Sequence, residues 1–384
     1  MVADRINRIG ESSTVKSAST VAQLKKKGIK VISFGMGEPD FTTPKNIIEA
    51  AERAMENGFT HYTQTEGIPE LREAIAEKSR DENGIDCTAG NVLVLPSKFA
   101  IFATMFTLLE EGDGALIPDP GWQTYSACAS LCGAASFYYD GVDGIRRAID
   151  ECRDAGKRPK LLVLNSPSNP TGKVMTDGEI REIAGIAEEE KIHVLSDEVY
   201  EKLTYDGTHV SIGKLLGDRV ITVNGFSKTY AMTGWRVGWC IAYGEVFDGI
   251  KKIAQHTQTC VTSFAQYGAL EALTGPQDSV NSMKDEFRKR RDFMCRALSE
   301  MDAIRFEPPA GAFYLFPSYT LDVSSEEFCN TMLERAHVLL TPGSAFGRNG
   351  EKHFRISYAT SMEDLRTGAE RIGETIERYK CEKF

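Results

Sequence analysis

The chain has 384 residues, of which 41% are hydrophobic and 26% charged, and a chain of this length usually forms two domains. Its formal charge of -10 argues against a nucleic-acid-binding protein, because phosphates require a concentrated positive surface. It contains no run of about 18 uncharged apolar residues and no apolar stretch behind its charged start. We therefore expect neither a membrane span nor a secretory signal, and we interpret the chain as cytoplasmic.

The cysteines and histidines do not form a metal-binding pattern. Nine cysteines are scattered from Cys87 to Cys381 without a CxxC pair, and the six histidines form no HxxxH pair. We therefore expect no metal site, and we interpret the cysteines as reduced packing residues.

Short apolar runs alternate with amphipathic stretches between residues 90 and 242, which is typical of βα units that build a mainly parallel sheet. Several runs are almost continuously apolar, as expected of strands buried on both faces. The predicted strands cover residues 91–95, 115–118, 136–139, 160–165, 192–196, 220–224 and 237–242. The predicted helices between them cover residues 100–110, 124–131 and 176–190.

From about residue 276 the pattern changes to that of a smaller α+β domain. Its predicted elements are a charged helix over residues 279–301, a strand over 313–316, a helix over 324–335, strands near 338–341 and 354–357, and a final helix. We expect the N-terminal segment to pack with this domain. The predicted organisation is a large domain of residues 44–278 and a small domain of residues 1–43 and 279–384.

Chemically distinctive residues follow four of the predicted strands, at positions 96–98, 165–172, 197–200 and 225–228. In open α/β sheets, ligands bind beyond the carboxyl ends of the strands. We therefore expect these four segments to converge on one crevice.

Individual residues in these segments, and Arg236 shortly after the last of them, suggest an anionic ligand and a reactive amine. Ser97 and Lys98 open a helix, which favours a phosphate, although a serine there also serves as an ordinary cap. Asp197 ends an apolar strand, so it either pairs with a cation such as a protonated pyridine nitrogen or caps a helix. Burial of Lys228 would favour the neutral amine that imine formation requires. Arg236 suits either a phosphate or a structural ion pair.

The chain resembles the class I and II aminotransferases, which are pyridoxal-phosphate enzymes of fold type I. The motifs that carry the resemblance are GEPDF at 37–41, Tyr62 with GIPELR at 67–72, NPTG at 169–172, SDEVY at 196–200, SKTYAMTGWR at 227–236 and FRIS at 354–357. They keep the family's order and spacing over nearly the whole chain. The resemblance implies a mainly parallel central α/β sheet that binds pyridoxal 5'-phosphate, and a smaller α+β domain.

Residue by residue, the resemblance implies that Lys228 carries the cofactor as a Schiff base and that Asp197 pairs with its pyridine nitrogen. Tyr200 and Asn169 would hold the oxygen at the 3' position of the ring, and Trp122 would stack on the ring.

The resemblance also implies a site for the phosphate of the cofactor. The residues implied there are Ser97, Lys98, Ser227 and Arg236. Tyr62 matches a residue that reaches the phosphate of a neighbouring subunit, which implies a homodimer. The chain departs from many relatives at Gly225, where they have a serine that binds the phosphate, and this puts that single contact in doubt.

The resemblance also implies a site for an amino acid and a 2-oxo acid. Arg355 matches the residue that binds the α-carboxylate, with Gly37, Trp122 and Asn169 beside it. Lys98 matches a lysine that binds the distal carboxylate in prokaryotic aspartate aminotransferases, which favours aspartate or glutamate with 2-oxoglutarate. Broad, aromatic or alanine specificity, a β-lyase reaction and a cofactor-binding sensor without turnover remain as alternatives.

Overall fold

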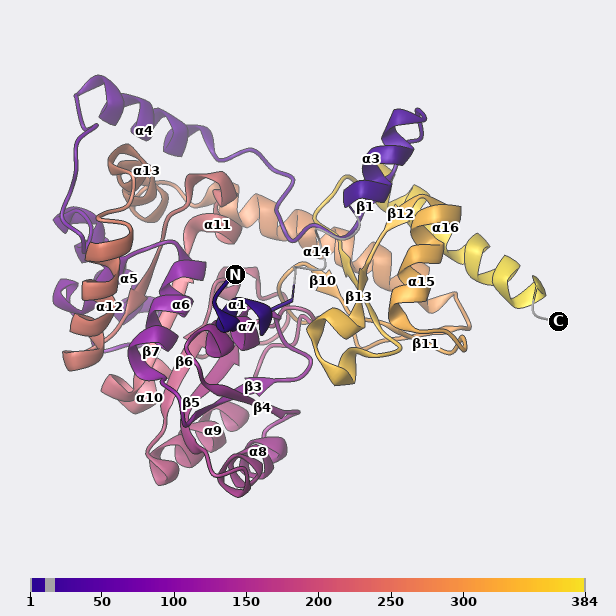
Figure 1. The fold of residues 1–384 in the computed structure, drawn as a ribbon. Helices are drawn as coiled ribbons and strands as arrows, with labels where there is room; N and C mark the ends of the chain where they lie inside the picture. The colour runs from indigo at the N-terminus through magenta and orange to yellow at the C-terminus, as the bar shows by residue number, and fades with distance from the viewer. Residues whose placement is uncertain (1, 11–17, 383–384) are drawn as a thin grey trace.

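The structure is a computed structural model that describes residues 2–10 and 18–382. We call residues 45–274 the sheet region, and residues 278–382 together with the strand at 32–33 the C-terminal region. Figure 1 shows the two regions side by side, with the orange and yellow C-terminal region next to the sheet. None of the described helices is both long and apolar enough to cross a membrane.

Seven strands form the central sheet in the order β2-β8-β7-β6-β5-β3-β4. They are β2 (Val92–Val94), β3 (Asp113–Pro118), β4 (Ala135–Tyr139), β5 (Arg158–Asn165), β6 (His193–Asp197), β7 (Val220–Gly225) and β8 (Gly238–Ile241). Strand β8 runs antiparallel to β2 and β7, and the other neighbouring strands are parallel. The predicted mainly parallel α/β fold is confirmed.

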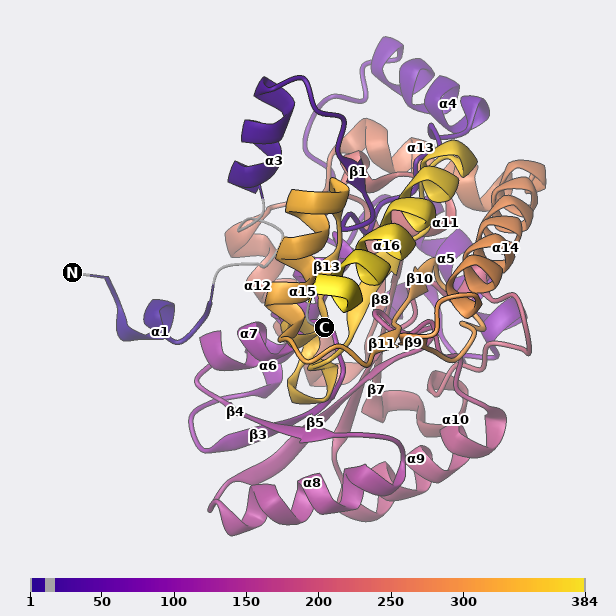
Figure 2. The same ribbon diagram turned by 90° about the vertical axis from the view of Figure 1, so that its right-hand side faces the viewer.

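Helices cover both faces of the sheet, because alternate side chains of a buried strand point in opposite directions. Leu161 and Val163 join the cluster under one set of helices, whereas Leu162 and Leu164 join the cluster on the other face. The first set is α6 (Ser97–Leu108), α7 (Thr124–Leu131) and α12 (Gly244–Thr257). The second is α8 (Asp143–Asp154), α9 (Asp177–Glu190) and α10 (Gly213–Leu216), and α8 and α9 lie below the strands in Figure 2.

A third apolar cluster lies at the β2 and β8 edge of the sheet. The helices that contribute to it are α4 (Lys45–Glu56), α5 (Pro69–Asn83) and α13 (Ser263–Thr274). Short turns complete this region: η1 (Ala89–Asn91), η2 (Glu201–Leu203), η3 (Gly217–Arg219), α11 (Phe226–Thr229) and η4 (Thr233–Trp235).

The C-terminal region has longer helices and short strand pairs. Its elements are α14 (Asp278–Ser299), β9 (Ile304–Arg305), β10 (Tyr314–Leu315), β11 (Ser318–Tyr319), α15 (Ser325–Thr331), η5 (Met332–Ala336), β12 (Val338–Leu339), β13 (Thr341–Pro342), η6 (Gly343–Phe346), η7 (Arg348–Gly350), β14 (Phe354–Ser357) and α16 (Met362–Glu382). The strand expected near 338–341 is divided in two, because β12 pairs with β1 (Ile32–Ser33) whereas β13 pairs with β14.

The N-terminal segment contacts both regions. Helix α1 (Asp4–Asn7) lies against α7 of the sheet region, whereas β1 pairs with β12 of the C-terminal region. Helix α3 (Ala18–Lys26) precedes β1.

Candidate active site

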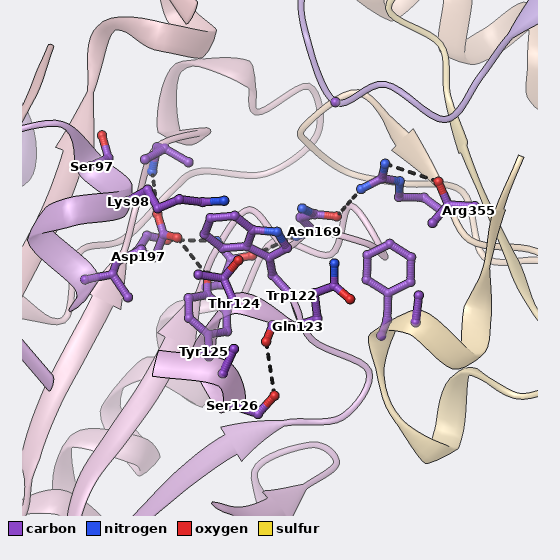
Figure 3. A pocket seen from close by; sticks show the side chains of 18 of the residues that line it. Ser97, Lys98, Trp122, Gln123, Thr124, Tyr125, Ser126, Asn169, Asp197 and Arg355 are labelled. Atoms are coloured by element: carbon purple, nitrogen blue, oxygen red, sulfur yellow. Dashed lines mark hydrogen bonds between the residues drawn. The ribbon is translucent and has the colours of Figure 1, made fainter. Parts of the chain in front are cut away.

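A cavity of about 940 Å³ lies where the carboxyl ends of β5, β6 and β7 meet the C-terminal region. Figure 3 shows part of its lining, with Asp197 and Trp122 on the sheet side and Arg355 opposite. The predicted site residues that line the cavity are Gly37, Ser97, Lys98, Trp122, Asn169, Asp197, Tyr200, Ser227, Lys228, Arg236 and Arg355. The strand ends therefore converge as the sequence predicts.

Lys228 lies in the short helix α11 that follows β7. Its Nζ donates a hydrogen bond of 2.6 Å to the carbonyl oxygen of Gly37. Burial is the largest influence on this amine and lowers the pKa of Lys228 to about 8; Glu38 opposes the shift, and Arg355 adds to it. A substantial fraction of the amine is therefore neutral in mildly alkaline solution.

Asp197 is the last residue of β6 and is 3% exposed. The hydroxyl of Tyr125 donates a hydrogen bond of 2.7 Å to its Oδ2. Burial raises the pKa of Asp197 to about 6, while the hydrogen bond from Tyr125 and the charge of Lys228 favour the carboxylate and limit the rise. The carboxylate is thus ionised at neutral pH and has capacity for a further donor.

Tyr200 lies three residues after the end of β6, immediately before the turn η2, and its ring contacts Phe313 and Tyr314 of the C-terminal region. Its hydroxyl lies 2.8 Å from that of Tyr314. Burial, followed by the neighbouring Tyr314, raises the pKa of Tyr200 well above its ordinary value. The phenol therefore stays protonated and can donate to an oxygen in the cavity.

Arg355 lies on β14 and reaches the opposite wall of the cavity. Its guanidinium donates to Oδ1 of Asn169 at 2.9 Å and to the carbonyl oxygen of Gly35 at 2.7 Å. It also lies over the rings of Tyr314 and Phe346, 4.5 and 5.0 Å from their centroids. Its Nε is buried without a hydrogen-bond partner. A buried guanidinium with spare donors suits a bound carboxylate.

Ser97 starts helix α6, and its hydroxyl donates 2.9 Å to the carbonyl oxygen of Asn224. A Cβ added at Gly225 would collide with this hydroxyl and would also lie 3.1 Å from the Cα of Gly238. The departure from serine at Gly225 therefore has a steric cause: the space for a side chain there is filled by Ser97.

Two further cations, Lys98 and Arg236, line the same cavity. The ammonium of Lys98 lies 4.8 Å from the centroid of a Trp122 ring. Arg236 has the left-handed φ of 58°, and its guanidinium donates 2.7 Å to the carbonyl oxygen of Thr233. Ser227 lines the cavity beside Lys228. Lysine, arginine and hydroxyl groups gathered in this way suit a phosphate.

Tyr62 is the predicted residue that this cavity does not include. It is 86% exposed on the surface of the sheet region. The chain itself therefore does not bring Tyr62 to the cavity that the other predicted residues line.

Sequence reasoning assigned no role to two tyrosines at this site, Tyr125 and Tyr314. Trp122 lies just before α7 and Tyr125 in its first turn, and the N–H of Tyr125 donates 3.1 Å to the carbonyl oxygen of Trp122, so both residues reach the cavity and their proximity in sequence was the available signal. Nothing near Tyr314 in the sequence signals its position, because β10 meets the cavity only through its pairing with β14.

Comparison with known proteins agrees with this geometry. Residues 29–372 match the family model described as aminotransferase class I and II. A probable aspartate aminotransferase of Methanocaldococcus jannaschii is 41% identical, with 90% of this chain and 93% of that protein covered.

Solved structures of aminotransferases have the same fold. An aspartate aminotransferase from Thermus thermophilus with maleate has a TM-score of 0.92 at 33% identity, covering 98% of this chain and 99% of that one. An alanine aminotransferase from Pyrococcus furiosus has a TM-score of 0.93 at 33% identity, covering 98% of this chain and 100% of that one. A family match over most of the chain and a cavity that gathers the family's motif residues lead to one conclusion: this chain belongs to the class I and II aminotransferases.

Proposed function

We propose that the protein holds pyridoxal 5'-phosphate at Lys228 and moves the α-amino group of aspartate or glutamate to a 2-oxo acid, with 2-oxoglutarate as the preferred acceptor. The observation that carries the proposal is a buried amine with a lowered pKa in the same cavity as the buried carboxylate of Asp197. When bound, the cofactor supplies an aldehyde that condenses with amines and a ring that accepts electrons.

The residues present fit this group. Asp197 would pair with the pyridine nitrogen, and a cationic partner would favour its carboxylate over the protonated form that burial promotes. Tyr200 and Asn169 would hold the oxygen at the 3' position. Trp122 offers a ring face beside them. The residues proposed at the phosphate are Ser97, Ser227 and Arg236, with Lys98 contributing positive charge.

Lys228 and Arg355 would perform the work on the substrate. The neutral Nζ of Lys228 accepts the proton from the substrate Cα, for which a pKa near the working pH is favourable. Arg355 binds the α-carboxylate through its spare donors and so orients the Cα–H bond toward the amine. The hydrogen bond between Arg355 and Asn169 keeps the guanidinium in place.

A second cation supports an acidic substrate. Lys98 points into the cavity across Trp122, and no carboxylate among the described residues forms an ion pair with it. An ammonium at the start of a helix is unfavourable unless an anion accompanies it. The names of the relatives, including a Thermus thermophilus structure with maleate, support a dicarboxylic substrate.

The cofactor chemistry is tested by supplying the loaded protein with aspartate, glutamate, alanine and tyrosine and measuring 2-oxo acid formation. We expect Lys228→Ala to lose at least about a thousandfold in kcat, because it removes the only group proposed to move the Cα proton. An unaltered rate in that variant would overturn the proposal.

Substrate specificity is tested with Lys98→Ala. We expect kcat/KM for aspartate to fall about tenfold to a hundredfold, since one charged hydrogen bond is lost, while the value for alanine changes less than about threefold. The matched control is Lys45→Ala, another lysine in the first turn of a helix but outside the cavity. Equal losses for aspartate and alanine would contradict acidic specificity.

A homodimer completes the proposal. Tyr62 lies outside the cavity, and Met55 and Phe59 are also exposed, at 41% and 45%. We propose that this surface faces a second copy and that Tyr62 reaches the phosphate site of that copy. The native mass in solution tests this arrangement, and a monomer would contradict it.

A further inference from the structure

A buried polar cluster lies directly behind the end of β6. Glu198 points away from the cavity, because its side chain alternates with that of Asp197 at the end of the strand. Its carboxylate accepts hydrogen bonds from Ser196 at 2.8 Å and from Ser211 at 2.7 Å, both at Oε1. Its other oxygen lies 3.2 Å from Nε2 of His209, and the two side chains are 2% and 8% exposed.

A second buried carboxylate, Glu201, belongs to the same cluster. It accepts hydrogen bonds from Lys78 and, at 2.6 Å, from Asn83. The ligand atoms of Glu198, Glu201 and His209 lie within 4.8 Å of one another, a spacing that a metal ion could use. However, the ammonium of Lys78 already bonds to Glu201, so a side chain supplies positive charge at this position.

Protonation of His209 would balance the buried charges of the cluster, with Nε2 facing Glu198 while the buried Nδ1 has no hydrogen-bond partner in the described part of the chain. Lys78 provides one positive charge for the two buried carboxylates, and an unpaired buried carboxylate is costly. Lys78 also lies 3.4 Å from the exposed carboxylate of Glu82, whose charge Lys202 offsets at 2.8 Å. Burial opposes a charge on His209, but the hydrogen bond and attraction of Glu198, with Glu201, outweigh burial and Lys78 and raise the pKa of His209. Burial also opposes the charge of Glu201, yet Lys78 and His209 lower the pKa of Glu201 to about 2.

We infer that protonated His209 is a positioning residue for the cofactor site: its charge holds Glu198 and thereby fixes the turn from Asp197 to Tyr200. The link is short, because Glu198 is the next residue after Asp197 and its N–H donates 2.8 Å to the carbonyl oxygen of Val223 on β7. A displaced Glu198 would move Asp197 and Tyr200, the residues proposed to contact the pyridine nitrogen and the oxygen at the 3' position. The inference rests on the proposed function, since it assumes that Asp197 and Tyr200 face the cofactor.

The first experiment measures the charge itself by NMR titration of the histidine rings, with the His209 signal assigned from its loss in His209→Gln. We expect the His209 ring to titrate at a higher pH than His193, which lies at the other end of β6 and whose pKa burial lowers. A midpoint for His209 at or below that of His193 would overturn the inference. This measurement needs only the unaltered protein and the assignment spectrum.

The second experiment measures the dissociation constant for pyridoxal phosphate from pH 6 to pH 9. His209→Gln keeps a hydrogen-bond donor but no charge, so we expect its affinity to be about tenfold weaker at pH 6, with the deficit shrinking as the pH rises and His209 of the unaltered protein loses its proton. His193→Gln should stay within about twofold throughout.

A deficit in His209→Gln that is absent, or the same at every pH, would overturn the inference, because a merely structural role does not follow the titration of the ring. If His209→Gln does not fold, the NMR titration of the unaltered protein decides, with the His209 signal assigned as the one that persists when each of the other five histidines is substituted in turn. Failure of the unaltered protein to bind pyridoxal phosphate would overturn the proposed function. This outcome is distinguishable from failure of the inference, because the NMR titration of His209 does not depend on cofactor binding.

Discussion

At the residue scale, the chemistry of this site depends on neighbours that are distant in the chain. Asp197 ends its strand next to Glu198, yet its protonation state also depends on Tyr125, 72 positions earlier. Burial is the main cause of the lowered pKa of Lys228, and the loop at Gly37 contacts this amine through a hydrogen bond over 191 positions. Local sequence therefore identifies the groups proposed to react, and folding sets their protonation.

The hydroxyl of Tyr125 gives a prediction at this scale. Tyr125→Phe removes a donor from the Asp197 carboxylate, so the pKa of Asp197 should rise further and the carboxylate should be lost at a higher pH as the solution is acidified. We expect pyridoxal phosphate to bind about tenfold more weakly near pH 6 and closer to normally at pH 8. Affinity measured across this range checks the expectation.

Tyr139→Phe is the matched control, because that buried hydroxyl donates to the carbonyl oxygen of Val163 and does not line the main cavity. An equal effect of the two substitutions would show that Tyr125 acts through general packing and not through Asp197.

At the scale of elements, pairing partners decide where segments begin and end. Helix α8 is absent from the predicted helices, although Ile145, Ala148, Ile149 and Cys152 follow helical spacing and face the sheet. The periodic signal for this helix is therefore present in the sequence. By contrast, the division of the strand near 338–341 follows from its two partners, β1 and β14, which periodicity within the segment does not encode.

Helix α9 gives a prediction at this scale. Thr176 accepts a hydrogen bond from the backbone N–H of Glu179, whose carboxylate in turn accepts from the backbone N–H of Thr176, which forms a capping box. We expect Thr176→Ala to lower the free energy of unfolding by about 1 kcal/mol, measured by denaturant unfolding, without changing kcat/KM. Thr274→Ala, whose hydroxyl only bonds back to Leu270 within its helix, should cost less.

At the scale of the whole molecule, the site depends on the contact between the two regions. Asp119, after β3, accepts hydrogen bonds from the backbone N–H groups of Arg348 and Asn349, both at 3.1 Å. The N–H of Gly121 donates 2.7 Å to the carbonyl oxygen of Phe346. Because the Phe346 ring lies against the guanidinium of Arg355, this contact connects the sheet to the proposed carboxylate site.

We predict that Asp119→Asn loosens this connection. An asparagine offers one acceptor oxygen where the structure uses two, so one N–H loses its partner. We expect KM for aspartate to rise about fivefold while the dissociation constant for pyridoxal phosphate changes less than about twofold. Steady-state kinetics and cofactor titration measure the two effects. The exposed neighbour Asp140 is the control, and Asp140→Asn should change neither quantity.

Features that are local or periodic follow from the order of the amino acids alone. Alternating apolar runs indicate the mainly parallel sheet, and the polar segments after its strands indicate one crevice, because the carboxyl ends of parallel strands share an edge. Family motifs lie in several of these segments, and the FRIS motif with Arg355 lies in a strand of the C-terminal region. Local sequence is therefore sufficient to select Lys228, Asp197 and Arg355 as site residues.

The side chains that complete those groups are brought to them by the folded chain. The contacts of Tyr125 with Asp197, of Tyr314 with Tyr200, and of Ser97 with the space beside Gly225 join segments far apart in the chain. The pairing of Glu198 with His209 depends on how the loop after η2 returns to β6. The periodicity of the sequence indicates which face of a helix or strand a side chain occupies. Its partner depends on which distant segment packs against that face, and this packing determines the burial, the charge balance and the pKa values of the site.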